Sequence, residues 1–154
     1  MKKLIILSIL TLISSVTSYG QWVTKTVDNK LDPVYKIAYC SDLSKKAVLK
    51  LEKVEDELAF YMIGTYFCED LIKVDIALVV NGQSKVYNIT AIKSSDSKAL
   101  FLIENLLAED QASFLSDLKA CSSAVTRINE TYCSSDIFKF NMTGSTNAVS
   151  FMLK

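Results

Sequence analysis

The sequence predicts a mainly β domain, either a β-sandwich or a partly open barrel arranged as an antiparallel meander, with one helix in the C-terminal half and a short final helix. Three observations predict this class. Apolar and polar residues alternate in many short segments, an Asn-Gly pair separates two long alternating segments, and a helical period appears only from residue 109 onward.

Five alternating segments, rich in β-branched and aromatic residues, predict the first five strands. They cover residues 22–27, 34–40, 47–54, 56–63 and 71–80. Asn81 and Gly82 then predict a two-residue hairpin turn, because both central positions of that turn need positive φ. The partner strand is expected at 83–92, and a further strand is expected at 99–103 after a polar loop.

Residues 109–120 predict a helix. Gln111, Phe114, Leu115 and Leu118 fall on one face at helical spacing. Acidic residues occupy the first turn of this segment and a lysine occupies the last, which matches the helix dipole.

Strand alternation returns after this helix, at residues 123–129 and 136–142. Gly144 and Ser145 then predict the start of the short final helix, with Ser145 as its N-cap.

The N-terminus has the pattern of a secretory signal peptide. Lys2 and Lys3 precede an apolar run at 4–13, and small and polar residues follow at 14–20. The apolar run is shorter than the roughly 20 residues that a bilayer-spanning helix needs. The sequence therefore predicts a secreted or periplasmic protein with no stable membrane insertion after cleavage.

Two cleavage positions fit this signal. Cleavage after Gly20 leaves Gln21 first, and cleavage after Ser18 is the alternative. With the first choice, residues 1–20 are the signal peptide and residues 21–154 form a single domain of ordinary size.

Charge argues against nucleic acid as a partner. The chain has 17 basic and 17 acidic residues, and removal of Lys2 and Lys3 leaves a net charge of −2. Binding to nucleic acid requires a basic excess, which this chain lacks.

The four cysteines, Cys40, Cys68, Cys121 and Cys133, suit structural disulfides in an oxidising compartment. Three pairings are possible. The expected strands place Cys40 and Cys68 at the same end of the meander, which favours Cys40–Cys68 and leaves Cys121–Cys133. No Cys-x-x-Cys motif and no histidine occur, so the sequence predicts no metal site and no cofactor.

The absence of histidine also excludes Ser-His-Asp and Cys-His catalysis. A hydrolase that uses paired carboxylates stays possible, with candidates in the run at 51–58: Glu52, Glu55, Asp56 and Glu57. Such a charged run between strands is more typical of a solvated face. Asp75 lies in an apolar strand, where alternation places it with Lys73 on the outward face.

Aromatic residues are concentrated in the N-terminal strands. Most are expected in the core, but exposed aromatic side chains are typical anchors of protein interfaces. Tyr61 and Tyr66 are the two that we expect to be exposed and to form a possible interface.

A family resemblance rests on the order of several segments. A tryptophan opens the mature chain, a Ser-Ser-Asp-Ser loop precedes Lys-Ala-Leu-Phe, and Phe-Leu-Ser-Asp-Leu-Lys precedes a strand at 124–128 and the run at 138–149. This order resembles small exported proteins of the invasion-associated locus B type and related accessory proteins of type VI secretion loci. The similarity is most visible over 96–152. It implies a non-catalytic β-sandwich and assigns no functional residue.

These observations predict an exported, disulfide-stabilised, non-catalytic binding or accessory module of the cell envelope or secretome, whose partner is another protein. One alternative is the histidine-free hydrolase described above. Another is a structural subunit that self-assembles through a sheet edge.

Overall fold

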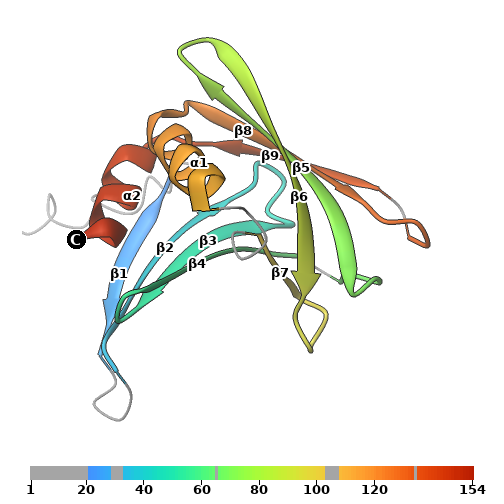
Figure 1. Ribbon diagram of the computed structural model, residues 1–154, viewed down its shortest axis with the longest axis horizontal. Coiled ribbons are helices and arrows are strands. Elements are labelled where there is room, and N and C mark those ends of the chain that lie inside the picture. Colours follow the sequence, from blue (N-terminus) through green and yellow to red (C-terminus); the bar gives the residue numbers. More distant parts are fainter. Residues whose placement is uncertain (1–20, 29–32, 65, 103–107, 134) are drawn as a thin grey trace, which may run out of the picture.

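The computed structural model describes residues 21–154, apart from residues 29–32, 65, 103–107 and 134. Within this part of the chain, nine strands form one sheet and two helices pack against it (Figure 1). The strands are β1 (Val23–Val27), β2 (Tyr35–Ser41), β3 (Val48–Val54), β4 (Glu57–Ile63), β5 (Leu71–Val80), β6 (Gln83–Lys93), β7 (Ala99–Phe101), β8 (Ser123–Asn129) and β9 (Asp136–Asn141). The helices are α1 (Ala108–Ala120) and α2 (Ser145–Leu153).

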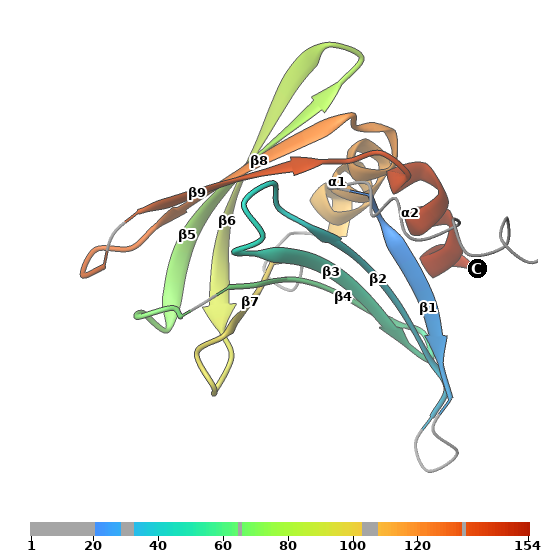
Figure 2. The same cartoon turned by 180° about the vertical axis from the view of Figure 1, so that it is seen from behind.

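The mainly antiparallel β class with two helices is confirmed. All neighbouring strands are antiparallel, in the order β1-β2-β3-β4-β7-β6-β5-β8-β9. The sheet is strongly curved, with β1 to β4 on one side and β5, β6, β8 and β9 on the other (Figures 1 and 2). The strands belong to one continuous sheet, as in a partly open barrel.

The curved sheet brings its two ends together. The Leu43 N–H donates to the Lys139 carbonyl at 2.8 Å, and the Trp22 N–H donates to the Thr143 carbonyl at 3.3 Å. The loop after β2 and the residue before β1 thus contact β9 and the turn that follows it.

The strand order departs from a simple meander at one point. β5 does not pair with β4, because β7 and β6 lie between them in the sheet. The segment from Gly64 to Asp70 therefore passes from one half of the sheet to the other, and this crossing positions the site described below.

The Asn-Gly hairpin forms as the sequence predicts. Asn81 and Gly82 have φ values of 51° and 76°, and they join β5 to β6 in one continuous ladder. Two positive φ values are the signature of a type I′ turn, whose twist matches that of the flanking strands.

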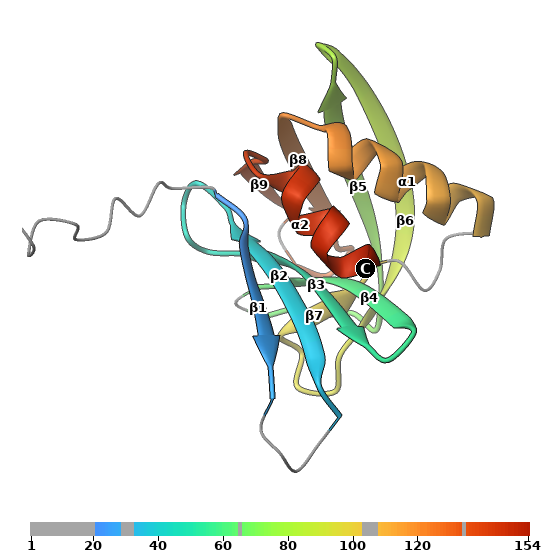
Figure 3. The same ribbon diagram turned by 90° about the vertical axis from the view of Figure 1, so that its left-hand side faces the viewer.

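The core lies on the inner face of the sheet, under the two helices. Figure 3 shows α1 and α2 next to each other against the strands. Phe114 and Leu118 of α1 and Val149 and Met152 of α2 are at most 1% exposed, and the Phe114 ring lies 5.3 Å from that of Phe60 in β4. Each such side chain contributes about 1.5–3 kcal/mol by leaving water.

A polar link also fastens α1 to β6. Asp117 in α1 is buried, and it accepts two hydrogen bonds from the Lys85 ammonium at 2.8 and 2.9 Å and a third from the Tyr87 hydroxyl. The helix is therefore positioned by an ion pair at its surface as well as by its apolar face.

The expected N-cap of the final helix is wrong. Gly144 is the N-cap, with a φ of 88° that favours glycine, and Ser145 is the first helical residue. The Ser145 hydroxyl lies 3.1 Å from the Lys119 carbonyl and 3.2 Å from the Cys121 carbonyl. This serine therefore ties α2 to the end of α1.

Among the residues that the structure describes, neither helix is long and apolar enough to cross a membrane.

Candidate functional site

A row of mostly apolar residues crosses the outer face of the sheet, opposite the helices. Cross-strand pairing aligns its members on seven strands, and we call them the outer row: Val23, Tyr39, Lys50, Tyr61, Phe101, Ile92 and Leu71. Directly paired residues share one face of a sheet. Val23, Tyr39, Ile92 and Leu71 are exposed, and the other three are half-buried.

The middle of the outer row is held by a polar network. The Lys50 ammonium lies 2.6 Å from the Glu52 carboxylate and 5.1 Å from the centre of the Tyr61 ring, and the Tyr61 hydroxyl donates to Glu52. The Tyr61 ring also packs at 5.7 Å against that of Phe101. Tyr61 is thus fixed on three sides.

This network sets the charge of Glu52. Desolvation by itself would raise the pKa of its carboxyl, but hydrogen bonds from Lys50 and Tyr61 outweigh it and lower that pKa. Glu52 lines an open hollow of about 370 Å³ together with Glu57 and Tyr61. A general acid in a hydrolase needs a raised carboxyl pKa, so Glu52 is shifted in the opposite direction from that role.

The outer row ends at Leu71, next to a disulfide that joins two loops. Cys68, in the loop from Gly64 to Asp70, is bonded to Cys133, in the loop at 130–135 between β8 and β9, with a Cα–Cα distance of 6.4 Å. Residues 65 and 134 lie outside the described part of these loops. We call the two loops the loop pair.

The expected disulfide pairing is wrong. Cys68 pairs with Cys133, whereas Cys40 and Cys121 are free and buried. The prediction assumed that the segments around Cys40 and Cys68 stay at one end of a meander. Because β7 and β6 are inserted between β4 and β5, the chain after β4 carries Cys68 across the sheet to β5 and its neighbour β8.

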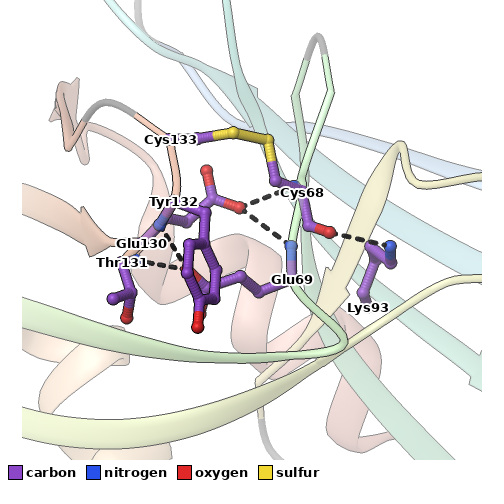
Figure 4. Close-up of a disulfide and its surroundings, with 7 residues drawn as sticks. All are labelled: Cys68, Glu69, Lys93, Glu130, Thr131, Tyr132 and Cys133. Carbon is purple, nitrogen blue, oxygen red and sulfur yellow. Dashed lines mark hydrogen bonds between the residues drawn. A yellow bond between two sulfur atoms is a disulfide. The ribbon is translucent and has the colours of Figure 1, made fainter.

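Two carboxylates, one from each loop, reinforce the link made by the disulfide (Figure 4). Glu130 accepts the N–H groups of Cys68 and Glu69 at 2.6 and 3.3 Å. Glu69 in turn accepts the N–H groups of Thr131 and Tyr132, the latter at 2.9 Å. Each loop thus supplies a carboxylate to the backbone of the other.

Lys93 connects the loop pair to the sheet. Its ammonium donates to the Cys68 carbonyl at 3.3 Å, as Figure 4 shows, and lies 3.3 Å from the Asp70 carboxylate. Because Lys93 is the last residue of β6, the loop that carries Cys68 is tied to both the β8–β9 hairpin and the β6 end.

The loop pair presents two exposed tyrosines. Tyr132 is 87% exposed and directly precedes Cys133, and Tyr66 is 64% exposed and lies two residues before Cys68. Leu71, at the end of the outer row, is 62% exposed. Tyrosines on rigid loops offer a large contact area at a small cost in conformational entropy.

Tyr61 and Tyr66, the two possible interface residues predicted from the sequence, lie in different parts of the surface. Tyr66 lies in the loop pair, whereas Tyr61 is half-buried in the middle of the outer row with its hydroxyl engaged by Glu52. Sequence reasoning missed Tyr132, Glu69 and Glu130. The position of Tyr132 next to a cysteine in a short polar segment is the signal that could have drawn attention to it.

Cys40 and Cys121 are core residues. The Cys40 thiol donates to the Asn141 carbonyl at 3.3 Å, and the Cys121 thiol donates to the Leu118 carbonyl at 3.2 Å. Burial, with the nearby Asp42 charge, raises the pKa of Cys40 to about 11, and burial raises that of Cys121 to about 12. A raised pKa keeps both thiols protonated near neutral pH, whereas the thiolate is the form that acts as a nucleophile.

In the described part of the chain, Cys68, Glu130 and Cys133 bring three potential metal-ligand atoms within 4.8 Å of one another. The disulfide uses both sulfurs, and a sulfur binds a metal ion as a thiolate. This group therefore has no thiolate to offer while the disulfide is intact.

A second polar cluster lies on the outer face of the other half of the sheet. Asp75 accepts hydrogen bonds from the side-chain amides of Asn88 at 2.6 Å and Asn129 at 3.0 Å, and it lies in an open hollow of about 330 Å³ with Lys73. Asp75 and Lys73 share the outward face, as alternation predicts.

A comparison of the chain with protein-family models, curated proteins and solved structures gives no significant match. The resemblance to locus B-type and secretion accessory proteins therefore stays a prediction.

Proposed function

We propose that this protein is an exported binding module, secreted or periplasmic, that docks another protein through the outer row and the loop pair. The observation that carries the proposal is the outer row, which crosses seven strands and ends at Leu71, three residues after Cys68. The Cys68 disulfide joins two loops that each carry an exposed tyrosine. Aromatic anchors on a preorganised surface are typical of protein interfaces.

Export is supported by two independent features. The residues at 1–20 have the pattern of a cleavable signal, and the Cys68–Cys133 disulfide suits an oxidising compartment. The core of the described domain begins just after those residues, at Trp22, which is 6% exposed.

Binding fits the surface better than the two alternatives do. The hydrolase alternative needs a general acid with a raised carboxyl pKa, and the pKa of Glu52 is lowered, so Glu52 does not fit that role. Self-assembly through a sheet edge would use β1 or β9. Lys25 lies in the middle of β1 and Lys139 lies within β9, and edge lysines oppose pairing with another strand.

Site-specific photocrosslinking in the native host tests the proposal. A photoreactive amino acid is placed at Tyr132 or at Tyr39 of the outer row, and at Val86 as the matched control. Val86 is 59% exposed on β6 but lies six residues from Ile92, about 20 Å along the strand.

We expect one dominant protein adduct from Tyr132 and Tyr39 and none from Val86. The same adducts at all three positions would contradict the proposed surface. Adducts formed only between copies of this chain would instead support the self-assembling subunit.

A further inference from the structure

We propose that Gln21, once it is the first residue of the exported protein, cyclises to pyroglutamate. This inference rests on the export proposed above and on cleavage after Gly20, and it assigns a covalent modification to the mature N-terminus.

The folded domain begins at this point. Trp22 is 6% exposed, and its N–H donates to the Thr143 carbonyl, so cleavage beyond Trp22 would remove a core residue. Gln21 is exposed. Cleavage after Gly20 therefore leaves one exposed residue ahead of the first buried side chain.

The chemistry needs no co-reactant. The unprotonated α-nitrogen of Gln21 attacks Cδ of its own side-chain amide, a C–N bond closes a five-membered lactam, and the bond to the amide nitrogen breaks. The departing nitrogen takes up the proton that the α-nitrogen loses and leaves as ammonia. No electrons are transferred, and the product has no ionisable N-terminal amine.

The fold favours the cyclised form. The Gln21 Cγ lies 4.0 Å from the position that a Cβ at Gly144 would occupy, so Gln21 lies beside the start of α2. That helix has no acidic residue in its first turn and no side-chain cap. The positive end of the helix dipole disfavours a positive charge on the neighbouring Gln21, and the lactam removes the α-ammonium charge of the uncyclised terminus.

Pyroglutamate formation distinguishes between the two signal cleavage positions that the sequence allows. Cleavage after Ser18 would leave Tyr19 first, and tyrosine has no side-chain amide to cyclise. Pyroglutamate can form only if the signal is removed after Gly20.

Mass spectrometry of the protein exported by its native host tests this inference. The full chain is expressed with its own signal, and the intact mass and the N-terminal peptide are measured. The matched control is Gln21→Asn, which keeps a side-chain amide but is one methylene too short to form the five-membered lactam.

With the Cys68–Cys133 disulfide formed, we expect the mass of residues 21–154 less two hydrogens and one ammonia, and for Gln21→Asn the mass of the variant less two hydrogens only. A Gln21 terminus that still carries its amine after prolonged incubation at neutral pH would overturn the inference and leave export intact. An N-terminus at Tyr19 would also overturn it. An uncleaved chain retained in the cell would contradict the proposed export itself.

A second measurement tests the role of the fold. The cyclised protein should melt roughly 1–3 °C above Gln21→Asn, because only the variant keeps a positive charge beside α2. Equal melting temperatures would show that the helix end does not favour the modification.

Discussion

Glu69 and Glu130 act reciprocally across the Cys68–Cys133 disulfide. The Glu130 carboxylate accepts two backbone N–H groups from the loop that carries Glu69, and the Glu69 carboxylate accepts two from the loop that carries Glu130. A disulfide alone allows rotation of the two loops about one covalent link. The four hydrogen bonds fix their relative orientation, and with it the placement of Tyr66 and Tyr132.

The first prediction concerns the hydrogen bonds that Glu130 accepts from the other loop. Glu130→Ala should lower the free energy of unfolding by about 1–2 kcal/mol, because it leaves the Cys68 and Glu69 N–H groups without their carboxylate acceptor. Glu130→Gln, which retains an acceptor oxygen, should cost less. Urea denaturation with the disulfide intact measures both. Equal stability of Glu130→Ala and the wild-type protein would show that the two hydrogen bonds to Glu130 contribute nothing to stability.

The second prediction concerns the disulfide itself. Cys68 and Cys133 are separated by 65 residues, and a covalent link over such a distance restricts the unfolded chain strongly. Replacement of both by serine should therefore lower the free energy of unfolding by about 4 kcal/mol.

Denaturation of the double variant, compared with the intact protein under non-reducing conditions, checks this value. Cys40→Ala is the control, because it leaves the disulfide in place and adds no polar group to the core. An unchanged stability in the double variant would contradict the pairing.

The third prediction concerns the other two cysteines. Cys40 and Cys121 should not react with a thiol reagent in the native protein, since both are buried and their pKa values are raised to about 11 and about 12. After unfolding without reductant, two thiols should react. A count of zero thiols in the unfolded protein would mean that all four cysteines are in disulfides, which would contradict free Cys40 and Cys121.

Much of the local structure could be predicted from the sequence. The strand at 71–80, the Asn81-Gly82 turn and the helix near 109–120 all depend on patterns within a few residues, and each lies where it was expected. Alternation also placed Asp75 and Lys73 on the outward face correctly. These features are determined by local side-chain periodicity and backbone preference.

The strand order could not be predicted in the same way. β7 is three residues long, and its insertion between β4 and β6 depends on pairing with distant strands, which leaves no local pattern. The error in the disulfide pairing follows from this one insertion. Ser145 was misplaced for a related reason, since its hydroxyl bonds to the end of α1, 24 to 26 residues away.

The candidate site could not be predicted from the sequence for a similar reason. Glu69 and Glu130 look like ordinary loop acids, and only the crossing of the chain after β4 brings each to the other's backbone, 61 to 63 residues away. The outer row is likewise a property of the register of seven strands, and no single strand reveals it.

The fourth prediction concerns Asp117 and the dependence of stability on pH. Burial by itself would raise the pKa of this carboxyl, but hydrogen bonds from Lys85 and Tyr87 outweigh burial and lower that pKa. The folded state therefore prefers the ionised form more than the unfolded chain does, whose Asp pKa is about 3.9. The resulting stabilisation is complete above that value and is lost as the pH falls below about 4.

Asp117→Asn should accordingly cost about 1–3 kcal/mol at neutral pH, and the difference from the unmodified protein should shrink as the pH approaches 3. Chemical denaturation at several pH values measures both effects. Asp136→Asn is the matched control, because it removes a carboxylate from an exposed position and should change stability by less than about 0.5 kcal/mol. If the cost of Asp117→Asn stayed constant from pH 7 to pH 3, the ionised form of Asp117 would not be what stabilises the contact between α1 and β6.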